Sequence, residues 1–236
     1  MALATLLASN APASIVLRVK ACAKKKSVMA KSDDSIERGA VLVELVQRAI
    51  NHGARVGGVS ASEIFDTAAE HVAVLLGDAV DAFRRGSFGT SIFLALTAIE
   101  ETAKAEIVTF RMNRPDGPTH GRDPLHDHGQ KHRLAVRETT FMGRLPNVLG
   151  PEVCARLARQ AESGGFTKLR ESSLYVNFDE QGVHVPEATM TRSQAREILL
   201  LALECADDIL VGWTNASFRL RERLDPWFTE LSLSAQ

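Results

Sequence analysis

Histidines are concentrated in one short stretch of the sequence, where they could carry out acid–base chemistry. Four of the seven fall between residues 120 and 132: His120, His126, His128 and His132. Imidazole changes charge near neutral pH and serves as a general acid or base, so this cluster is typical of a proton-transfer site. Residues 111–144 hold seven Lys or Arg against four Asp or Glu, a local excess of +3. This basic segment favours phosphate as the ligand.

Two other uses of these histidines stay open from the residues alone. His128 and His132 are four residues apart and could bind a metal ion together with Glu101. The sequence has neither an H-E-x-x-H motif nor paired E-x-x-H motifs, so we expect no metal and no other cofactor. The segment is also compatible with a polar helix that is merely solvated.

Two adjacent glutamates end the most apolar run of the chain. Glu101 lies seven residues after Leu94 and three after Ala98, which predicts that it shares their buried side of a helix. Glu100 precedes Lys104 by four residues and is predicted to pair with it. A carboxylate between helices needs a cationic partner. The alternative is a surface ion pair with an incidental acidic neighbour.

Helices must position these residues. Apolar spacing by threes and fours predicts a first helix over 36–50. Ser60 with Glu63 has the spacing of a capping box and begins a second helix that ends at 84–86. Residues 88–112 predict a third helix with almost no polar face, which we place at the centre of a bundle.

The second half of the chain is more varied. After a loop at 113–118, a polar helix is predicted over about 125–142, and another over about 150–165. Alternating residues predict a small β-hairpin near residues 173–186. Thr191 with Gln194 then caps a long final helix that extends through Trp213.

Composition excludes several classes of protein. The 236 residues are 45% hydrophobic and 24% charged, which is enough to bury a core and excludes disorder throughout. No run of 18 apolar residues without charge occurs, so we expect no membrane segment and a cytoplasmic protein. Three widely spaced cysteines fit neither a disulfide framework nor a zinc site.

The N-terminal segment differs from the rest in charge. Residues 1–32 hold six basic and no acidic side chains, and removing these six charges from the total of −1 leaves −7 for the rest. The segment has some features of a transit peptide. A disordered tail, or a spurious leader with Met29 as the natural first residue, is the simpler interpretation. We therefore expect a leader over 1–31 and a single helical domain over 32–236.

Three segments resemble the AbiV-type abortive-infection proteins. The first is residues 75–105, which contain Phe83-Arg84-Arg85-Gly86-Ser87-Phe88 and end in Glu100-Glu101-Thr102-Ala103-Lys104-Ala105. The second is Asp127-His128-Gly129-Gln130-Lys131, similar to the family's His-x-x-Lys element. The third joins Lys168 to Leu174-Tyr175-Val176-Asn177-Phe178, where Asn177 replaces the family's usual Asp. They follow the family's order over residues 64–186.

The resemblance implies an all-α, HEPN-like antiparallel helical bundle with the small β-hairpin. That superfamily is often dimeric and includes many metal-independent ribonucleases, which carry an Arg, a polar residue, a short spacer and a His. Residues 122–128 can be written as this motif, from Arg122 to His128.

Two functions follow as hypotheses. The first is an anti-phage effector that acts on RNA or a ribosome-associated target. In it His128 is the general acid or base, Arg122 holds the scissile phosphate and Glu101 orients His128. Binding residues would be Glu100, Lys104, Lys131, Lys168 and Tyr175. The alternative is a non-catalytic module that binds a phage or host protein and in which Glu101, Lys104, His128 and Lys131 form a buried polar network.

We also expect a homodimer. The resemblance implies it, and the predicted helix over 191–213 offers more apolar surface than one neighbouring helix would cover. The residues that provide this surface are Leu199, Leu200, Leu201, Leu203, Ile209, Leu210, Val211 and Trp213.

Overall fold

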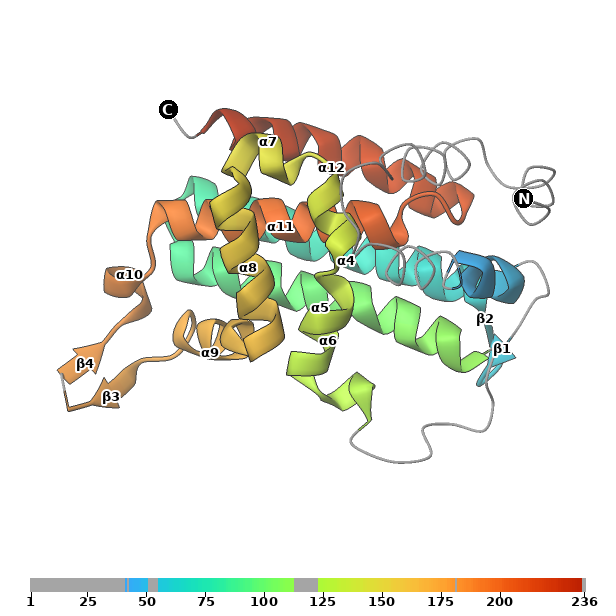
Figure 1. The fold of residues 1–236 in the computed structure, drawn as a ribbon, viewed down its shortest axis with the longest axis horizontal. Helices are drawn as coiled ribbons and strands as arrows, with labels where there is room; N and C mark the ends of the chain where they lie inside the picture. Colours follow the sequence, from blue (N-terminus) through green and yellow to red (C-terminus); the bar gives the residue numbers. More distant parts are fainter. Residues whose placement is uncertain (1–40, 42, 51–54, 113–122, 181, 235–236) are drawn as a thin grey trace, which may run out of the picture.

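The fold is an all-α bundle with two short antiparallel hairpins, in agreement with the predicted class (Figure 1). The computed structural model describes residues 41, 43–50, 55–112, 123–180 and 182–234. The predicted leader over 1–31 and Arg122 lie outside these residues. Residues 43–50 are helical, as expected for the first helix. Within these ranges no helix is both long and apolar enough to cross a membrane.

Two long helices joined by a tight turn form the centre of the bundle. They are α4 (Ala61–Arg84) and α5 (Phe88–Met112), whose bounds match the predicted second and third helices. Ser60 and Glu63 form the predicted capping box at the start of α4. Gly86 adopts φ 79° in the connecting turn, a conformation that glycine adopts at little cost. The two helices pack along their length, with α11 (Arg192–Leu210) lying across both (Figure 1).

A helix after α11 was missed by sequence reasoning. This helix, α12 (Asn215–Leu233), begins at a capping box of Thr214 and Ser217 and contains Pro226. Proline inside a helix removes a hydrogen bond, so the segment did not predict a helix. Because α12 packs on α11 and α4, it covers apolar surface that we had reserved for a dimer partner. Most of the side chains behind that prediction are fully buried within the chain: Leu199, Leu200, Leu201, Leu203 and Leu210.

The segment after α5 is a series of short helices that crosses its face. It consists of η1 (Pro124–His126), α6 (His128–Ala135), η2 (Glu138–Met142), α7 (Leu145–Leu149), α8 (Pro151–Ser163) and α9 (Gly165–Ser172). The predicted continuous helix over 125–142 is wrong. Asp127 is extended and its carboxylate accepts from the Gln130 amide, so it caps a new helix. Helix α8 was predicted, whereas α7 and α9 were not.

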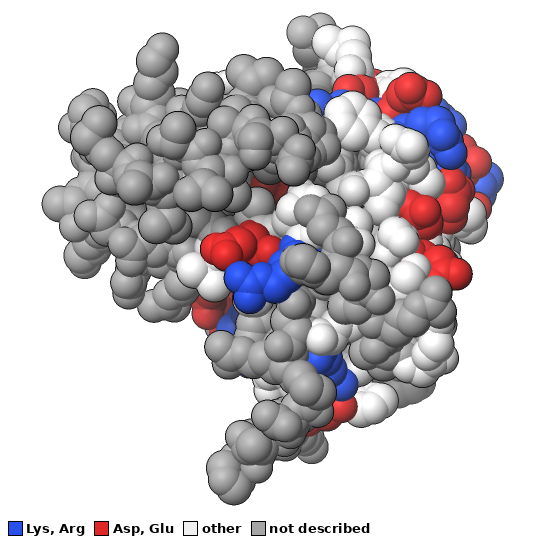
Figure 2. All heavy atoms as spheres, turned by 90° about the vertical axis from the view of Figure 1, so that its right-hand side faces the viewer, with Lys and Arg blue, Asp and Glu red and all other residues white. Residues whose placement is uncertain are grey.

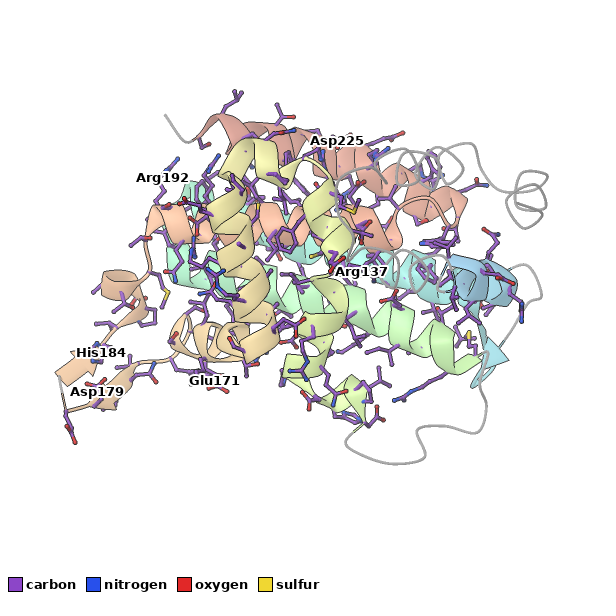
Figure 3. The ribbon with its side chains drawn as sticks, in the orientation of Figure 1. Arg137, Glu171, Asp179, His184, Arg192 and Asp225 are labelled. Atoms are coloured by element: carbon purple, nitrogen blue, oxygen red, sulfur yellow. The ribbon has the colours of Figure 1, made fainter. Side chains whose placement is uncertain are left out.

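Two small hairpins complete the fold. The predicted one pairs β3 (Asn177–Asp179) with β4 (Gly182–His184), with Phe178 opposite Val183. It projects from the body of the bundle, and the His184 ring lies 2.9 Å from Asp179 Oδ1 (Figure 3). The short helix α10 (Pro186–Thr189) leads from it to α11. The other hairpin, β1 (Arg55–Val56) with β2 (Val59–Ser60), was not predicted.

Candidate functional site

A buried carboxylate at the middle of α5 is the centre of the candidate site. Glu100 has only 3% of its side chain exposed. Its helical neighbours Ile92, Leu96 and Ala103, which lie eight and four residues before it and three after, are all fully buried. The sequence therefore places this glutamate on the side of α5 that α6 and α9 cover.

Four cationic or ionisable side chains surround Glu100, and we call these five residues the Glu100 cluster. His128 Nδ1 lies 2.6 Å and Lys131 Nζ 3.1 Å from Glu100 Oε2. His132 Nε2 lies 3.2 Å and Arg170 Nε 3.5 Å from Oε1. The first three come from one face of α6, where residues three and four apart are neighbours, and Arg170 comes from α9.

The cluster keeps Glu100 ionised. Burial alone would raise the pKa of the carboxyl group, but His132, His128 and Lys131 lower it to about 2. The carboxylate can therefore only accept hydrogen bonds at neutral pH. It follows that the His128 nitrogen nearest to it, Nδ1, carries a proton. Apart from the histidines, one carboxylate faces one lysine and one arginine, so these three groups have a net charge of +1.

Hydrogen bonding within the cluster is uneven. Oε2 accepts from His128, whereas Oε1 is buried and has no well-aligned donor, although His132 and Arg170 lie near it. The His132 ring is fully buried, stands edge-on to Phe166 at 5.7 Å, and leaves both nitrogens without an aligned partner. Buried polar groups of this kind are uncommon and are often found at functional sites.

Exposure separates the four partners into two pairs. Lys131 and His132 are buried, at 3% and 0% exposure, so they lie behind the carboxylate. His128 is 44% exposed and Arg170 22%. His128 Nε2 forms no hydrogen bond with any residue that the structure describes. The site therefore presents one imidazole edge and part of one guanidinium to solvent.

The predicted placement of the two glutamates is wrong. Glu100 is buried and contacts His128, whereas Glu101 is partly exposed and lies 2.5 Å from Lys104 Nζ. Glu101 does share a side of α5 with Leu94, but this is the less buried side, which also contains Thr97 and Lys104. The role of orienting His128, which we assigned to Glu101, thus falls to Glu100.

The other predicted site residues are dispersed. Lys131 belongs to the cluster, but its ammonium is buried against Glu100 and is not presented to a phosphate. Lys104 lies on the less buried side of α5, with Leu94, Thr97 and Glu101. Lys168 on α9 and Tyr175 before β3 are both exposed, with 59% of Tyr175 accessible. None of these last three contacts Glu100 in the described part of the chain.

Sequence reasoning missed Arg170 as a member of the site. Its segment was not predicted to be helical, and no local spacing connects it with residue 100. Its neighbour Lys168 was selected instead, from the family's Lys element. His132 was noted in the histidine cluster and named only as a metal ligand. Among the described residues no group of three His, Cys, Asp or Glu side chains is arranged to hold a metal ion.

On one other face of the bundle, the described residues carry charges of both signs. At the end of the bundle where α4 begins and α5 ends, basic and acidic side chains alternate rather than gather by sign (Figure 2). Two shallow hollows lie along α4, one of them shared with α12, and are lined by acidic and basic residues including Glu70 and Arg223. Neither hollow includes a member of the Glu100 cluster.

Fold and family comparison agree on the class of protein. The structure is an all-α bundle with small antiparallel hairpins, which agrees with a HEPN-like fold. The HEPN family model described as AbiV matches residues 60–207, more than half of the chain. The chain therefore belongs to the AbiV family of abortive-infection, HEPN-type proteins. Searches of curated proteins and of solved structures found no match.

Proposed function

We propose that this protein is an anti-phage effector that cleaves RNA without a metal ion, with His128 as the general base. One observation supports this most strongly: His128 is held by the ionised Glu100 through Nδ1, and its other edge is open to solvent. A carboxylate that fixes the tautomer and orientation of a histidine in this way increases the basicity of the free nitrogen.

The chemistry follows from that tautomer. Nε2 of the neutral ring accepts the proton of a ribose 2′-hydroxyl, and the 2′-oxygen attacks the adjacent phosphorus. The bond from phosphorus to the 5′-oxygen breaks, and this oxygen takes a proton from water or from the protonated His128. The products are a 2′,3′-cyclic phosphate and a 5′-hydroxyl end. The contact of Arg122 with the scissile phosphate stays a prediction from the sequence, and so does a phosphate contact of Lys104.

Purified full-length protein incubated with total RNA in EDTA tests this proposal. We expect cleavage by the wild type and a loss of about 10²–10⁴-fold for His128→Ala, the usual contribution of a general base. His126→Ala is the matched control, because His126 is an exposed histidine two residues away. Intact RNA at high protein concentration, or equal rates for the two variants, would contradict the proposal.

A non-catalytic role is the second candidate, and the β3–β4 hairpin favours it. Phe178 and Val183 face each other in register and are 76% and 62% exposed. Val176 and Val185, on the same side of the alternation, are exposed as well. An uncovered apolar face suits a phage or host protein as partner. In this case Phe178→Ser abolishes protection against phage, whereas His128→Ala preserves it.

Assembly and cellular role complete the proposal. The homodimer stays a prediction from the family resemblance, and light scattering should report about twice 25.7 kDa. Expression in a bacterial host should block growth only during phage infection. Protection without toxicity in uninfected cells is the expected outcome, and the absence of both effects would contradict the role in phage defence.

A further inference from the structure

Arg170 is paired less closely with the Glu100 carboxylate than Lys131 is. Lys131 lies against the carboxylate with its side chain buried, so this pair is already neutral. Arg170 approaches the same carboxylate only through Nε, at 3.5 Å, and without hydrogen-bond alignment. Its positive charge is therefore the excess charge of the cluster.

The guanidinium of Arg170 is also held in one orientation. Its central carbon lies 4.7 Å from the centre of the Phe93 ring, a stacked arrangement that suits the flat guanidinium group. Nε is buried, but the two terminal nitrogens are not, and they form no hydrogen bond with any residue of the described ranges. A planar pair of free N–H donors fits the oxygens of a phosphate.

One carboxylate connects Arg170 with His128. Arg170 lies beside Oε1 of Glu100 and His128 bonds to Oε2, so the two side chains approach the two oxygens of the same carboxylate. The acid next to His128 in the sequence, Asp127, caps α6 and hydrogen-bonds to Gln130. The acid next to Arg170, Glu171, is exposed. Both outer side chains thus combine partial exposure with a fixed orientation. Arg170 turns N–H donors toward solvent, and His128 turns its acceptor nitrogen Nε2.

We infer that Arg170 and His128 form a subsite for one phosphodiester group of single-stranded RNA. The inference rests on the proposed function and deepens it, because it assigns the phosphate contact to a residue of α9. Arg170 binds the non-bridging oxygens of the phosphate, and Lys131 and His132 hold the carboxylate that positions the pair.

Binding of an RNA that cannot be cleaved tests the subsite separately from catalysis. The probe is a fluorescent, mixed-sequence single-stranded oligonucleotide with 2′-O-methyl groups, which lacks the attacking hydroxyl. Its affinity is measured by anisotropy at several salt concentrations. Arg170→Gln should weaken binding about tenfold, as expected for loss of a hydrogen bond between charged groups. It should also reduce the slope of log affinity against log salt by about 0.7, the value for one phosphate contact on a single strand.

Two further variants keep the test decisive. Arg159→Gln removes an exposed arginine of α8 and should leave both affinity and slope close to the wild type. Arg170→Lys keeps the charge beside Glu100, so it preserves the fold and the salt slope if Arg170→Gln does not fold. It loses the planar pair of donors and should weaken binding by about threefold.

The possible results separate the subsite from the ribonuclease proposal. Equal affinities and slopes for Arg170→Gln and Arg159→Gln overturn the subsite, even if the wild type cleaves RNA. No binding of the oligonucleotide by the wild type at about 100 μM protein also overturns it. Binding that depends on Arg170 while unmodified RNA stays intact supports the subsite and refutes the nuclease.

Discussion

Two polar clusters lie on different helices of the bundle, and they are built in different ways. The second, which we call the Glu204 cluster, consists of Arg144, Glu204, Asp207, Arg221 and Asp225 and joins the start of α7 to α11 and α12. It contains more acids than bases, whereas the Glu100 cluster contains more cations. Asp225 lies on α12, far from the hairpin (Figure 3).

Hydrogen bonding distinguishes the clusters further. Arg144 donates to Glu204 at 2.9 Å and to Asp225 at 2.6 Å, and Arg221 donates twice to Asp207. The carboxylates of the Glu204 cluster thus have aligned donors, as in a network that stabilises the fold. In the Glu100 cluster, Oε1 lacks such a donor and two partners face solvent. Both clusters have a buried guanidinium nitrogen without a partner, Arg144 Nη2 and Arg170 Nε, and both have partly exposed members. The comparison teaches that neither burial of charge nor partial exposure alone identifies a site, and that the unsatisfied carboxylate oxygen beside a histidine is what sets the Glu100 cluster apart.

The carboxylates of the two clusters also respond to burial in opposite directions. For Glu100, three neighbouring groups outweigh burial, and the pKa falls to about 2. For Glu204, burial outweighs Arg144, and the pKa of the carboxyl group is raised. Acid should therefore destabilise the first cluster and spare the second.

The largest expected effect is that of Glu100→Ala. Removing the carboxylate leaves buried Lys131 and Arg170 without a counter-charge, which costs about 3–5 kcal/mol. This is a large share of the ~5–15 kcal/mol that stabilises a domain. Urea unfolding at neutral pH measures it. If Glu100→Ala lowers the free energy of unfolding by less than Arg144→Ala does, the Glu100 carboxylate is not the more important of the two for stability.

Acid unfolding gives the next largest effect. Because the folded-state pKa of Glu100 is lower than the usual 4.5, its charge stabilises the fold above pH 4.5. This contribution, about 3 kcal/mol, is lost as the pH falls from 4.5 toward 2. Glu100→Gln should be less stable than the wild type at pH 6, and the difference should shrink by pH 2.5. A difference that stays constant with pH would contradict the lowered pKa.

Arg144→Ala should cost less, about 2 kcal/mol. Glu204 loses its main partner but can take up a proton, which its raised pKa already favours. The variant should leave RNA binding and cleavage unchanged below its melting temperature, in contrast to substitutions in the Glu100 cluster. A loss of activity in the folded variant would mean that the Glu204 cluster is also part of the site.

The sequence predicted those parts of the fold that local patterns determine. The capping box at Ser60 and the apolar spacing of α4 and α5 specify both helices without help from the rest of the chain. The same is true of Thr191, whose side chain caps α11. For α12, the capping box at Thr214 is a local signal, but the helix continues past Pro226 because it packs on α4 and α11, and local spacing does not contain that information.

The candidate site was predicted in its residue types but not in its geometry. His128 and Lys131 were identified because they lie in the histidine-rich basic segment and match the family's His-x-x-Lys element. Arg170 reaches Glu100 across 70 residues of chain, through the packing of α9 on α5, so only the structure brings the two together. The choice of the wrong glutamate has a simpler cause. Leu94, from which the buried side was inferred, is apolar but lies on the less buried side of α5.

The smallest expected effect concerns the ion pair of Glu101 and Lys104, and it tests the difference between Glu100 and Glu101. Glu101 and Lys104 are three residues apart on α5, with 23% and 37% of their side chains exposed. Water screens such a pair, so the coupling between Glu101→Ala and Lys104→Ala in a double-mutant cycle should be about 0–1 kcal/mol. Each single substitution should change the melting temperature little, although Glu101 is next to Glu100 in the sequence. A coupling above about 2 kcal/mol would show that the less buried side of α5 is covered in solution, as it would be by a homodimer partner.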